Sequence, residues 1–405
     1  MKQTFYTLIF FLPMTLFSQD WRYDEFIPTF KSEILSDSTL EKTKLNRTLR
    51  NLSFIGAYQE LYEMDMYVDT SLTITFENIT NNHEITDAKK YILSKSVDEK
   101  ILIVNESHHR PEHRHLTKSL LPKLYEQGYR YLAIEAMHSN QYYEITHYPE
   151  NKHNLADTTI MTRGYPLMKA CSGTYVKEPV FGNLIRKAIG LGFTIVGYEQ
   201  NGKGRELNQA KNIAKIYDED PNAKILVHCG YGHLIEASRI NRAGKRDTFM
   251  AGYLKEITGI NPITIDQTNY YNLKNVNQAV FAKTNAHTPQ VLLKDGQPFK
   301  SHEVEKQEYW DMTIFHEPIS YIQDRPKWMV KTETNKSFEL DLSQILIDYP
   351  VRIKLLSLDD RLDAVPIDIM EIDNEQTICI MYGEIEKSKF IIENRNGDRQ
   401  IIVVP

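Results

Sequence analysis

The chain has 405 residues, of which 41% are hydrophobic, 11% aromatic and 25% charged. This composition is too apolar for a disordered chain and too highly charged for a bundle of membrane helices. The 48 basic and 54 acidic residues give a formal net charge of −6. A nucleic-acid-binding protein needs a dense basic face, so nucleic acid is not an expected partner.

The first residues have the pattern of a secretory signal peptide. Lys2 precedes an apolar stretch over residues 8–17, which ends at Ser18. A positive start, a short apolar segment and a small residue at the junction are typical of a cleaved export signal. The stretch is shorter than the roughly 20 residues that span a bilayer, and Pro13 interrupts it. We expect cleavage after residue 18 and export to the periplasm or the cell exterior, with no transmembrane segment left after cleavage.

Residues 20–100 are polar and favour helices, with one amphipathic segment around residues 45–66 and no pattern that suggests chemistry. Short apolar runs then alternate with amphipathic segments. The expected strands are 101–104, 131–134, 193–196, 224–227 and 263–265, and the expected helices are 111–127, 181–191, 206–217 and 248–257. This alternation is typical of a parallel sheet covered by helices on both faces. We predict an α/β domain over residues 19–325, with its defining motifs in 95–270 and a kink or break at Pro122.

After residue 325 the pattern changes to short strand-like runs. They are residues 338–342, 345–347, 351–356, 366–369, 377–381, 390–393 and 401–404. Asn396-Gly397 is a strong hairpin signal between the last two runs. Regular spacing of short strands predicts a small antiparallel, sandwich-like β domain over residues 326–405.

The candidate site comes from residues that follow the expected strands, because ligands bind at the carboxyl ends of the strands in an open parallel sheet. Acidic or histidine side chains follow four strands: Glu106, His108 and His109; Glu135; Glu199; and His228 and His233. We take Glu106, His109, Glu135 and His233 as one site and interpret Glu199 and His228 as structural. Other histidines of the same region are expected on the surface: His113, His115, His147 and His153.

Asn105 and Gly230 precede His109 and His233 at similar spacing. Asn and Gly tolerate positive φ, so each is expected to form a sharp turn that places its histidine in a first helical turn. There the helix dipole disfavours the imidazolium and keeps the ring a competent base or metal ligand. Two neutral histidines with two carboxylates would activate water directly or hold a divalent metal.

These motifs resemble the superfamily that joins erythromycin esterases, ChaN-type haem-binding lipoproteins and TIKI/PrgY-type proteins. The similar segments are 105–109 (Asn-Glu-Ser-His-His), the strand end at Glu135, the helix start from Gly204 to Ala210, and 230–233 (Gly-Tyr-Gly-His). The resemblance implies a parallel α/β domain and, in different branches, ester hydrolysis, a metal-dependent peptidase or haem binding. Asn105 replaces the usual glycine, for which we expect a small backbone adjustment.

The leading hypothesis is an exported hydrolase that cleaves an ester or amide bond of a small-molecule or peptide substrate. His109 would be the base, oriented by Glu106, while Glu135 and His233 position water or bind a metal. The predicted substrate-binding residues are Arg205, His108 and Tyr231. No Gly-x-Ser-x-Gly elbow is present.

Other interpretations stay open. A haem- or metal-binding protein would use Tyr231 and the His108-His109 pair as axial ligands, and a non-catalytic surface protein would bind a partner or glycan through its β domain. Three cysteines, Cys171, Cys229 and Cys379, allow at most one disulfide, and Cys229 is a minor nucleophile candidate.

Overall fold

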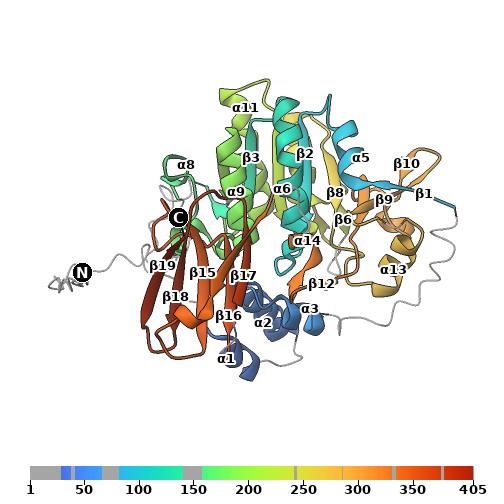
Figure 1. Cartoon of the computed structure of the whole chain (residues 1–405). Coiled ribbons are helices and arrows are strands. Elements are labelled where there is room, and N and C mark those ends of the chain that lie inside the picture. Colours follow the sequence, from blue (N-terminus) through green and yellow to red (C-terminus); the bar gives the residue numbers. More distant parts are fainter. Residues whose placement is uncertain are drawn as a thin grey trace, which may run out of the picture.

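The computed structural model describes residues 29–37, 42–65, 82–139, 157–240, 244–284, 286–330, 334–374 and 378–404 (Figure 1). The predicted signal peptide, His147 and His153 lie outside these residues. Within the described ranges, no helix combines the length and the apolar character needed to cross a membrane. The three cysteines are buried and unbridged.

A mostly parallel sheet forms the centre of the molecule. In spatial order its strands are β4 (Thr194–Glu199), β3 (Tyr131–His138), β5 (Ile225–Gly230), β2 (Ile101–Glu106), β8 (Ile263–Asp266), β11 (Met312–Phe315), β9 (Gln290–Lys294) and β1 (Glu84–Asp87), and β10 (Gln297–Pro298) pairs with β9. Neighbours from β4 to β11 are parallel, which confirms the predicted α/β fold. The antiparallel extension formed by β9, β1 and β10 was not expected.

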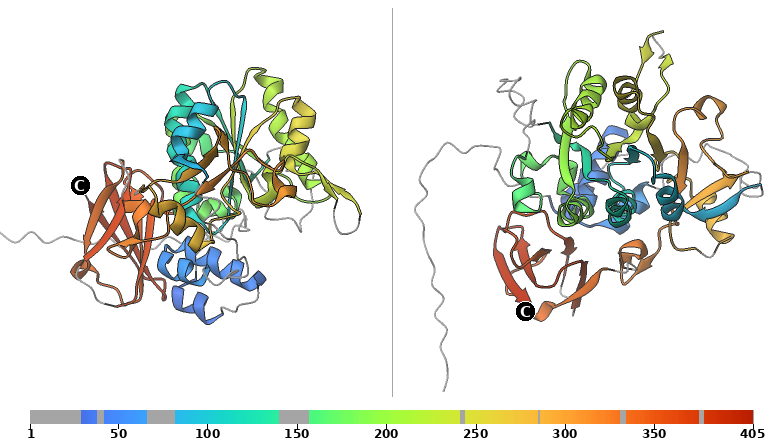
Figure 2. Two further views of the ribbon diagram at one scale, coloured as in Figure 1. Left: turned by 90° about the vertical axis from the view of Figure 1, so that its right-hand side faces the viewer. Right: turned by 90° about the horizontal axis from the view of Figure 1, so that it is seen from above.

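Helices cover both faces of this sheet (Figure 2). One face packs against α5 (Ala88–Lys95), α6 (Pro111–Glu126) and α9 (Pro179–Leu191), and the other against α10 (Arg205–Ala214) and α12 (Met250–Thr258). Leu102 of β2 faces the first layer and Ile103 the second, so alternate residues enter opposite cores. Burial on both faces explains why the strands are continuous apolar runs.

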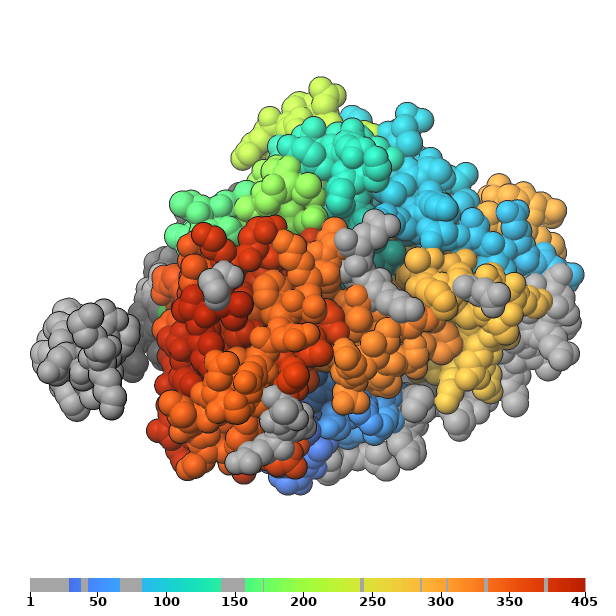
Figure 3. Space-filling model, viewed as in Figure 1, coloured from blue at the N-terminus to red at the C-terminus, as the bar shows by residue number. Residues whose placement is uncertain are grey.

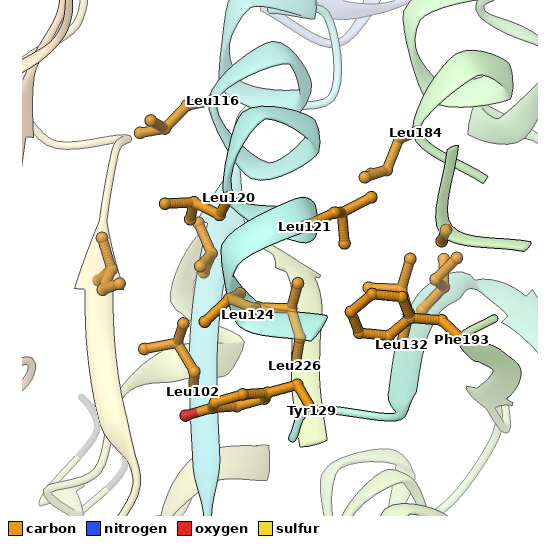
Figure 4. Packing of buried hydrophobic residues seen from close by; sticks show 14 of the residues in the cluster. Leu102, Leu116, Leu120, Leu121, Leu124, Tyr129, Leu132, Leu184, Phe193 and Leu226 are labelled. Atoms are coloured by element: carbon orange, nitrogen blue, oxygen red, sulfur yellow. The ribbon is translucent and has the colours of Figure 1, made fainter. Parts of the chain in front are cut away.

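Helix α6 contributes the largest apolar stripe of the first layer. Its Leu116, Leu120 and Leu124 pack towards the sheet, where Leu102 and Leu226 meet them (Figure 4). The helix continues through Pro122 to Glu126, so the break considered there does not occur. Pro122 removes one backbone hydrogen bond, while Leu120, Leu121 and Leu124 on both sides of it pack into the core and hold the helix together.

Three N-terminal helices form a separate cluster with α14 (Lys327–Val330). They are α1 (Lys31–Ser36), α2 (Lys42–Phe54) and α3 (Tyr58–Asp65), and α2 and α3 confirm the predicted amphipathic segment as far as it is described. Figure 1 shows these blue helices below α6 and beside the C-terminal strands. Side chains of α3 reach residues that follow β2, as the next section describes.

The C-terminal strands form two antiparallel sheets. In one, β14 (Lys336–Asp341) pairs with β17 (Ile378–Gly383); the other has the order β16 (Asp368–Ile372), β15 (Val351–Ser357), β18 (Ser388–Asn394) and β19 (Arg399–Val404). Both sheets contribute to one apolar cluster, as a sandwich requires. Gly397 turns the chain between β18 and β19 at a φ of 87°. Residues 345–347 are not a strand and follow a 3-10 turn, η6 (Leu342–Gln344).

Short elements complete the described residues. They are α8 (Ile160–Arg163), α11 (Ile216–Glu219), α13 (Lys274–Ala282), the ribbons β6 (Arg239–Ile240) with β7 (Arg246–Asp247) and β12 (Tyr321–Ile322) with β13 (Arg325–Pro326), and the 3-10 turns η2 (Ala170–Ser172), η3 (Tyr175–Lys177), η4 (Tyr231–Leu234) and η5 (Val304–Lys306).

Candidate functional site

The carboxyl ends of β2, β5 and β3 bring polar side chains together. Strand β5 lies between the other two, with Gly230 opposite Glu106 in the register. A Cβ atom built on Gly230 would lie 2.7 Å from Nε2 of His108 and 3.2 Å from Oε2 of Glu135. Glu106 and Glu135 therefore flank one point on β5, as the sequence predicted, but the histidine that joins them there is His108.

Glu106 is the centre of a buried cluster. Arg114 donates from Nε and Nη2 to its two oxygens at 2.5 and 2.9 Å. Nδ1 of His108 lies 3.0 Å from Oε1, and Nε2 of His228 lies 2.9 Å from Oε2. Burial favours the neutral acid, but the Arg114 charge and these hydrogen bonds outweigh it and hold the pKa of Glu106 well below its usual value. Glu106 is a carboxylate at neutral pH.

Arg114 joins this cluster to a second carboxylate. Its Nη1 donates to Oε2 of Glu178 at 3.0 Å, and Glu178 also caps the N-terminus of α9 by accepting from the backbone N–H of Phe181. The Arg114 side chain is fully buried. Removing any one of the three would leave an uncompensated buried charge, so Arg114 and its two acidic partners depend on one another.

His108 is oriented by its neighbours from three sides. Its ring stacks on Tyr175 with centroids 3.8 Å apart and meets the edge of Tyr231 at 5.0 Å. Since Nδ1 faces a carboxylate, the ring donates from Nδ1 and keeps the Nε2 lone pair beside Gly230. The side chain is 20% exposed, so water reaches this ring.

Glu135, like Glu106, contacts an arginine and a histidine. It accepts from Nη2 of Arg205 at 2.6 Å and from the backbone N–H of Gly230 at 2.5 Å, and Nε2 of His233 lies 3.2 Å from Oε1. Burial opposes ionisation, but the charges of His233 and Arg205 lower the pKa of Glu135 to about 2. Glu135 is therefore also a carboxylate.

His233 lies in the 3-10 turn η4, and its protonation differs from the prediction. Its Nδ1 is 2.8 Å from Oε2 of Glu206. Burial opposes the charged ring, but Glu135 and Glu206 outweigh it and raise the pKa of His233 to about 10. Nε2 also lies 2.9 Å from Nη1 of Arg205, a contact that suits only a neutral ring. The two carboxylates decide this competition, so the ring is protonated, in contrast to the neutral ring expected from the sequence.

Arg205 connects the Glu135 side to Glu199. It donates from Nε to both oxygens of Glu199, and its Nη2 also contacts that carboxylate. Together with Glu135 and His233, Glu199 occupies most of the donor directions of the guanidinium. Arg205 remains 33% exposed, so solvent reaches it from one side.

His109 does not pair with Glu106, contrary to the sequence-based hypothesis. Its Nδ1 lies 3.4 Å from Oγ of Ser107 and its Nε2 lies 3.2 Å from Oδ1 of Asp65 at the end of α3. The loop between β2 and α6 points His108 to the sheet edge and His109 to the N-terminal helices. Ser107, His109 and Asp65 are all at most 4% exposed, so a substrate does not reach this serine.

The predicted turns at Asn105 and Gly230 are also wrong. Both residues lie within strands, Gly230 has a φ of −89°, and the positive φ (42°) belongs to Tyr231. Asn105 instead donates to Oδ1 of Asp266 at 2.8 Å and to the carbonyl oxygen of Tyr231 at 2.9 Å. Gly230 is required for space, since a Cβ there would come within 2.3 Å of the His108 ring.

Sequence reasoning missed several residues that support the site. They are Arg114, Glu178, Glu206 and, from the N-terminal helices, Tyr58 and Asp65. His228 and Glu199, interpreted as structural, indeed hold Glu106 and Arg205. His113, expected on the surface, is fully buried and accepts from the backbone N–H of Ser107 at 3.0 Å, and His115 is half-buried beside Trp328. A signal existed: residues 112–115 contain no apolar side chain, which is unusual for a helix start packed on a core.

A divalent metal does not fit this arrangement. Within the described ranges, no three His, Cys, Asp or Glu side chains are arranged to hold a metal ion. Arg114 and Arg205 occupy the oxygens of Glu106 and Glu135 that a cation would need, and their charges would repel it.

The residues considered for haem do not act as a pair, and cysteine chemistry is disfavoured. Of His108 and His109, only His108 lies at the sheet edge, because His109 turns towards Asp65. Burial raises the pKa of Cys229 well above its ordinary value, with nearby Glu135 adding to the effect, so the nucleophilic thiolate is disfavoured.

Comparisons with known proteins add little. No family model and no curated protein matches the sequence. Similar solved structures include the type III effector HopBA1 (12% identity, 46% of this chain, 87% of that one) and the MARTX toxin effector domain RRSP from Vibrio vulnificus CMCP6 (16%, 59% and 46%), each with a TM-score of 0.30. A chain described as bacterial protein toxins has 14% identity over 57% of this chain and 47% of its own, also at 0.30. This chain thus spans less than half of the latter two.

Proposed function

We propose that the protein is a hydrolase that cleaves an ester or amide bond with water activated by His108. The observation that carries the proposal is the orientation of His108, with Nδ1 on the Glu106 carboxylate and Nε2 beside Glu135 at Gly230. A histidine held this way takes a proton at Nε2, while the carboxylate stabilises the imidazolium that forms. The motif resemblance to the erythromycin esterase superfamily favours the same reaction class.

The steps follow from the groups present. Nε2 of His108 removes a proton from water as the oxygen attacks the carbonyl carbon, and the carbonyl oxygen becomes an oxyanion. The imidazolium of His233 and the exposed side of Arg205 supply positive charge next to Glu135. His108 then returns its proton to the leaving oxygen or nitrogen, and the acid product is released. His233 keeps its proton throughout, because its pKa is about 10.

Three probes test the bond class on the purified chain: p-nitrophenyl acetate for esters, erythromycin for lactones and a mixture of quenched fluorogenic peptides for amides. We expect hydrolysis of at least one. His108→Ala should lower kcat/KM about 100- to 10,000-fold, the usual contribution of a general base. His287→Ala is the matched control, since that histidine is 61% exposed and distant in the fold.

The variant His109→Ala tests whether His108 or His109 is the general base. We expect the folded fraction of this variant to hydrolyse the probes as the unaltered chain does. Loss of activity in His109→Ala together with an active His108→Ala would contradict the proposal, as would inactivity of the unaltered chain on all three probes. Export is a separate proposal, supported by residues 1–18 alone, and an intact mass of the secreted chain checks it.

A further inference from the structure

A polar cavity lies away from the candidate site, between α6, α9 and the C-terminal β-sandwich. It has a volume of about 280 Å³. Its polar lining comprises Lys118, Asn183, Arg186, Lys187, Asn335 and Glu384. In Figure 3 the orange and red surface of the sandwich meets the green and teal surface of α9 and α6 along this boundary. The cavity therefore joins two parts of the fold.

The lining has more positive than negative charge. Glu384 is shared by two ammonium groups, with Nζ of Lys118 at 2.8 Å and Nζ of Lys187 at 2.9 Å. Arg186 is the third cation, and its Nη2 donates to Asp360 at 2.8 Å behind the cavity wall. Three cations thus line the cavity with one carboxylate among them.

Part of the Arg186 guanidinium lacks a partner. Its Nε and Nη1 atoms are buried and have no hydrogen-bond partner among the described residues. The Lys118 side chain is only 10% exposed, so its charge is also poorly hydrated. Gathering like charges in a half-buried place is unfavourable unless an anion compensates them. A protein with a net charge of −6 has no general excess of cations that would explain this group.

We propose that this cavity binds an oxyanion, a phosphate group that is either free or carried by a small molecule. Glu384 pairs with the two lysines and Asp360 with Arg186, so the three cations keep one uncompensated positive charge, which a phosphate monoanion neutralises. The volume is several times the roughly 30 Å³ that a water molecule occupies, so the oxyanion fits with water around it. A bound anion would link α6 and α9 to the sandwich through Lys118, Lys187 and the loop of Glu384.

The cavity is distinct from the candidate site but uses the same two helices. Lys118 lies one helical turn after Arg114 in α6, and α9 begins after Glu178, the second carboxylate partner of Arg114. Variants for the test must therefore leave Arg114 and Glu178 in place. Lys187 is the best residue to substitute, because its side chain is 31% exposed and its loss disturbs the packing least. The second variant, Lys118→Met, keeps an aliphatic side chain in the cavity wall.

Isothermal titration calorimetry of the full chain tests the proposal with sodium phosphate, glycerol phosphate and, at matched ionic strength, sodium chloride. We expect one phosphate per chain and no heat with chloride. Lys187→Ala and Lys118→Met should each weaken phosphate binding about tenfold or more, the effect of losing about 1.4 kcal/mol of binding free energy. Binding of inorganic phosphate alone identifies the free ion as the ligand, whereas tighter binding of glycerol phosphate identifies a phosphorylated compound.

Lys123→Ala is the control, because this lysine is 60% exposed on α6 and pairs with Glu126 outside the cavity. It should bind phosphate as the unaltered chain does. Absence of binding to both phosphate probes at millimolar concentration overturns the proposal. Binding that survives in both cavity variants, or that falls equally in Lys123→Ala, also overturns it, because the anion would then bind elsewhere.

Discussion

Glu106 and Glu135 lie on either side of β5 and have the same kinds of partner, an arginine and a histidine, yet their surroundings differ. Arg114 on Glu106 is completely buried, whereas Arg205 on Glu135 is 33% exposed. Behind Glu106, burial holds the pKa of the His113 ring well below its usual value, whereas beside Glu135 the two flanking carboxylates raise the pKa of His233 to about 10. The same residue types therefore form a buried internal support on one side and a partly solvated group of charges on the other.

This difference assigns separate tasks to the two sides. The residues around Glu106 orient His108. Burying their charges costs desolvation free energy, which only their mutual ion pairs offset. The Glu135 side keeps a proton and a guanidinium where water and a substrate reach them. Four changes, ordered by expected effect, test this division.

The first change compares the two arginines. Arg114→Met leaves Glu106 and Glu178 without their shared guanidinium and should cost about 3–5 kcal/mol of unfolding free energy. Arg205→Met, at a partly hydrated site, should cost about 1 kcal/mol. Urea denaturation of both variants measures the difference. If both variants lost the same unfolding free energy, the difference in burial between Arg114 and Arg205 would not make the two sides differ in stability.

The second change is acid. Burial, with Arg110 adding to it, lowers the pKa of His316 to about 3, and burial and the neighbouring His316 hold that of His113 well below its usual value. Both rings stay neutral when folded but gain a proton near pH 6.5 when unfolded, so stability is lost as pH falls from 6.5 towards 3.

Lowering the pH from 6.5 to 4.5 should cost about 2 kcal/mol for each of these histidines. Urea unfolding at both pH values measures the loss, and His316→Gln should show a smaller one. If His316→Gln lost as much unfolding free energy between pH 6.5 and 4.5 as the unaltered chain, His316 would not be a ring that stays neutral in the folded protein.

The third change is alkaline pH, which acts on the other side of β5. The pKa of His233 is raised to about 10, so its contribution to stability is complete below pH 6.5 and disappears as pH rises through 10. A single ring at a partly hydrated position should have a smaller effect than the two buried histidines. Proton NMR of the ring in the unaltered chain, with His233→Gln for assignment, gives the pKa directly. Titration near 6.5 would contradict the charged ring.

The fourth change is a single methyl group. Gly230→Ala places a Cβ within 2.3 Å of the His108 ring, so the ring must move away from Glu135. We expect a stability loss of about 1–2 kcal/mol, typical of overpacking, together with a loss of any hydrolytic activity. Gly190→Ala, which has open space at its Cβ, is the control. Full activity in Gly230→Ala would show that the His108 position is not required.

Much of the fold was predictable because it depends on local patterns. The apolar runs at 101–104 and 225–227 are strands because both of their faces are buried, and parallel strands end at one edge. This rule alone predicted that Glu106 and Glu135 would approach each other. It did not predict which of two adjacent histidines joins them, since the direction of a loop side chain depends on packing that begins far away, at Asp65 in α3.

The sequence by itself determined the α/β class, the β-sandwich after it and the edge where the acids gather, because hydrophobic period and strand direction are properties of neighbouring residues. Only the tertiary structure decided the charge of His233, the choice of His108 over His109 and the burial of Arg114. Each of these depends on partners distant in the chain, such as Glu206 for His233 and Glu178 for Arg114. Desolvation and ion pairing depend on three-dimensional distance, which the order of residues does not contain.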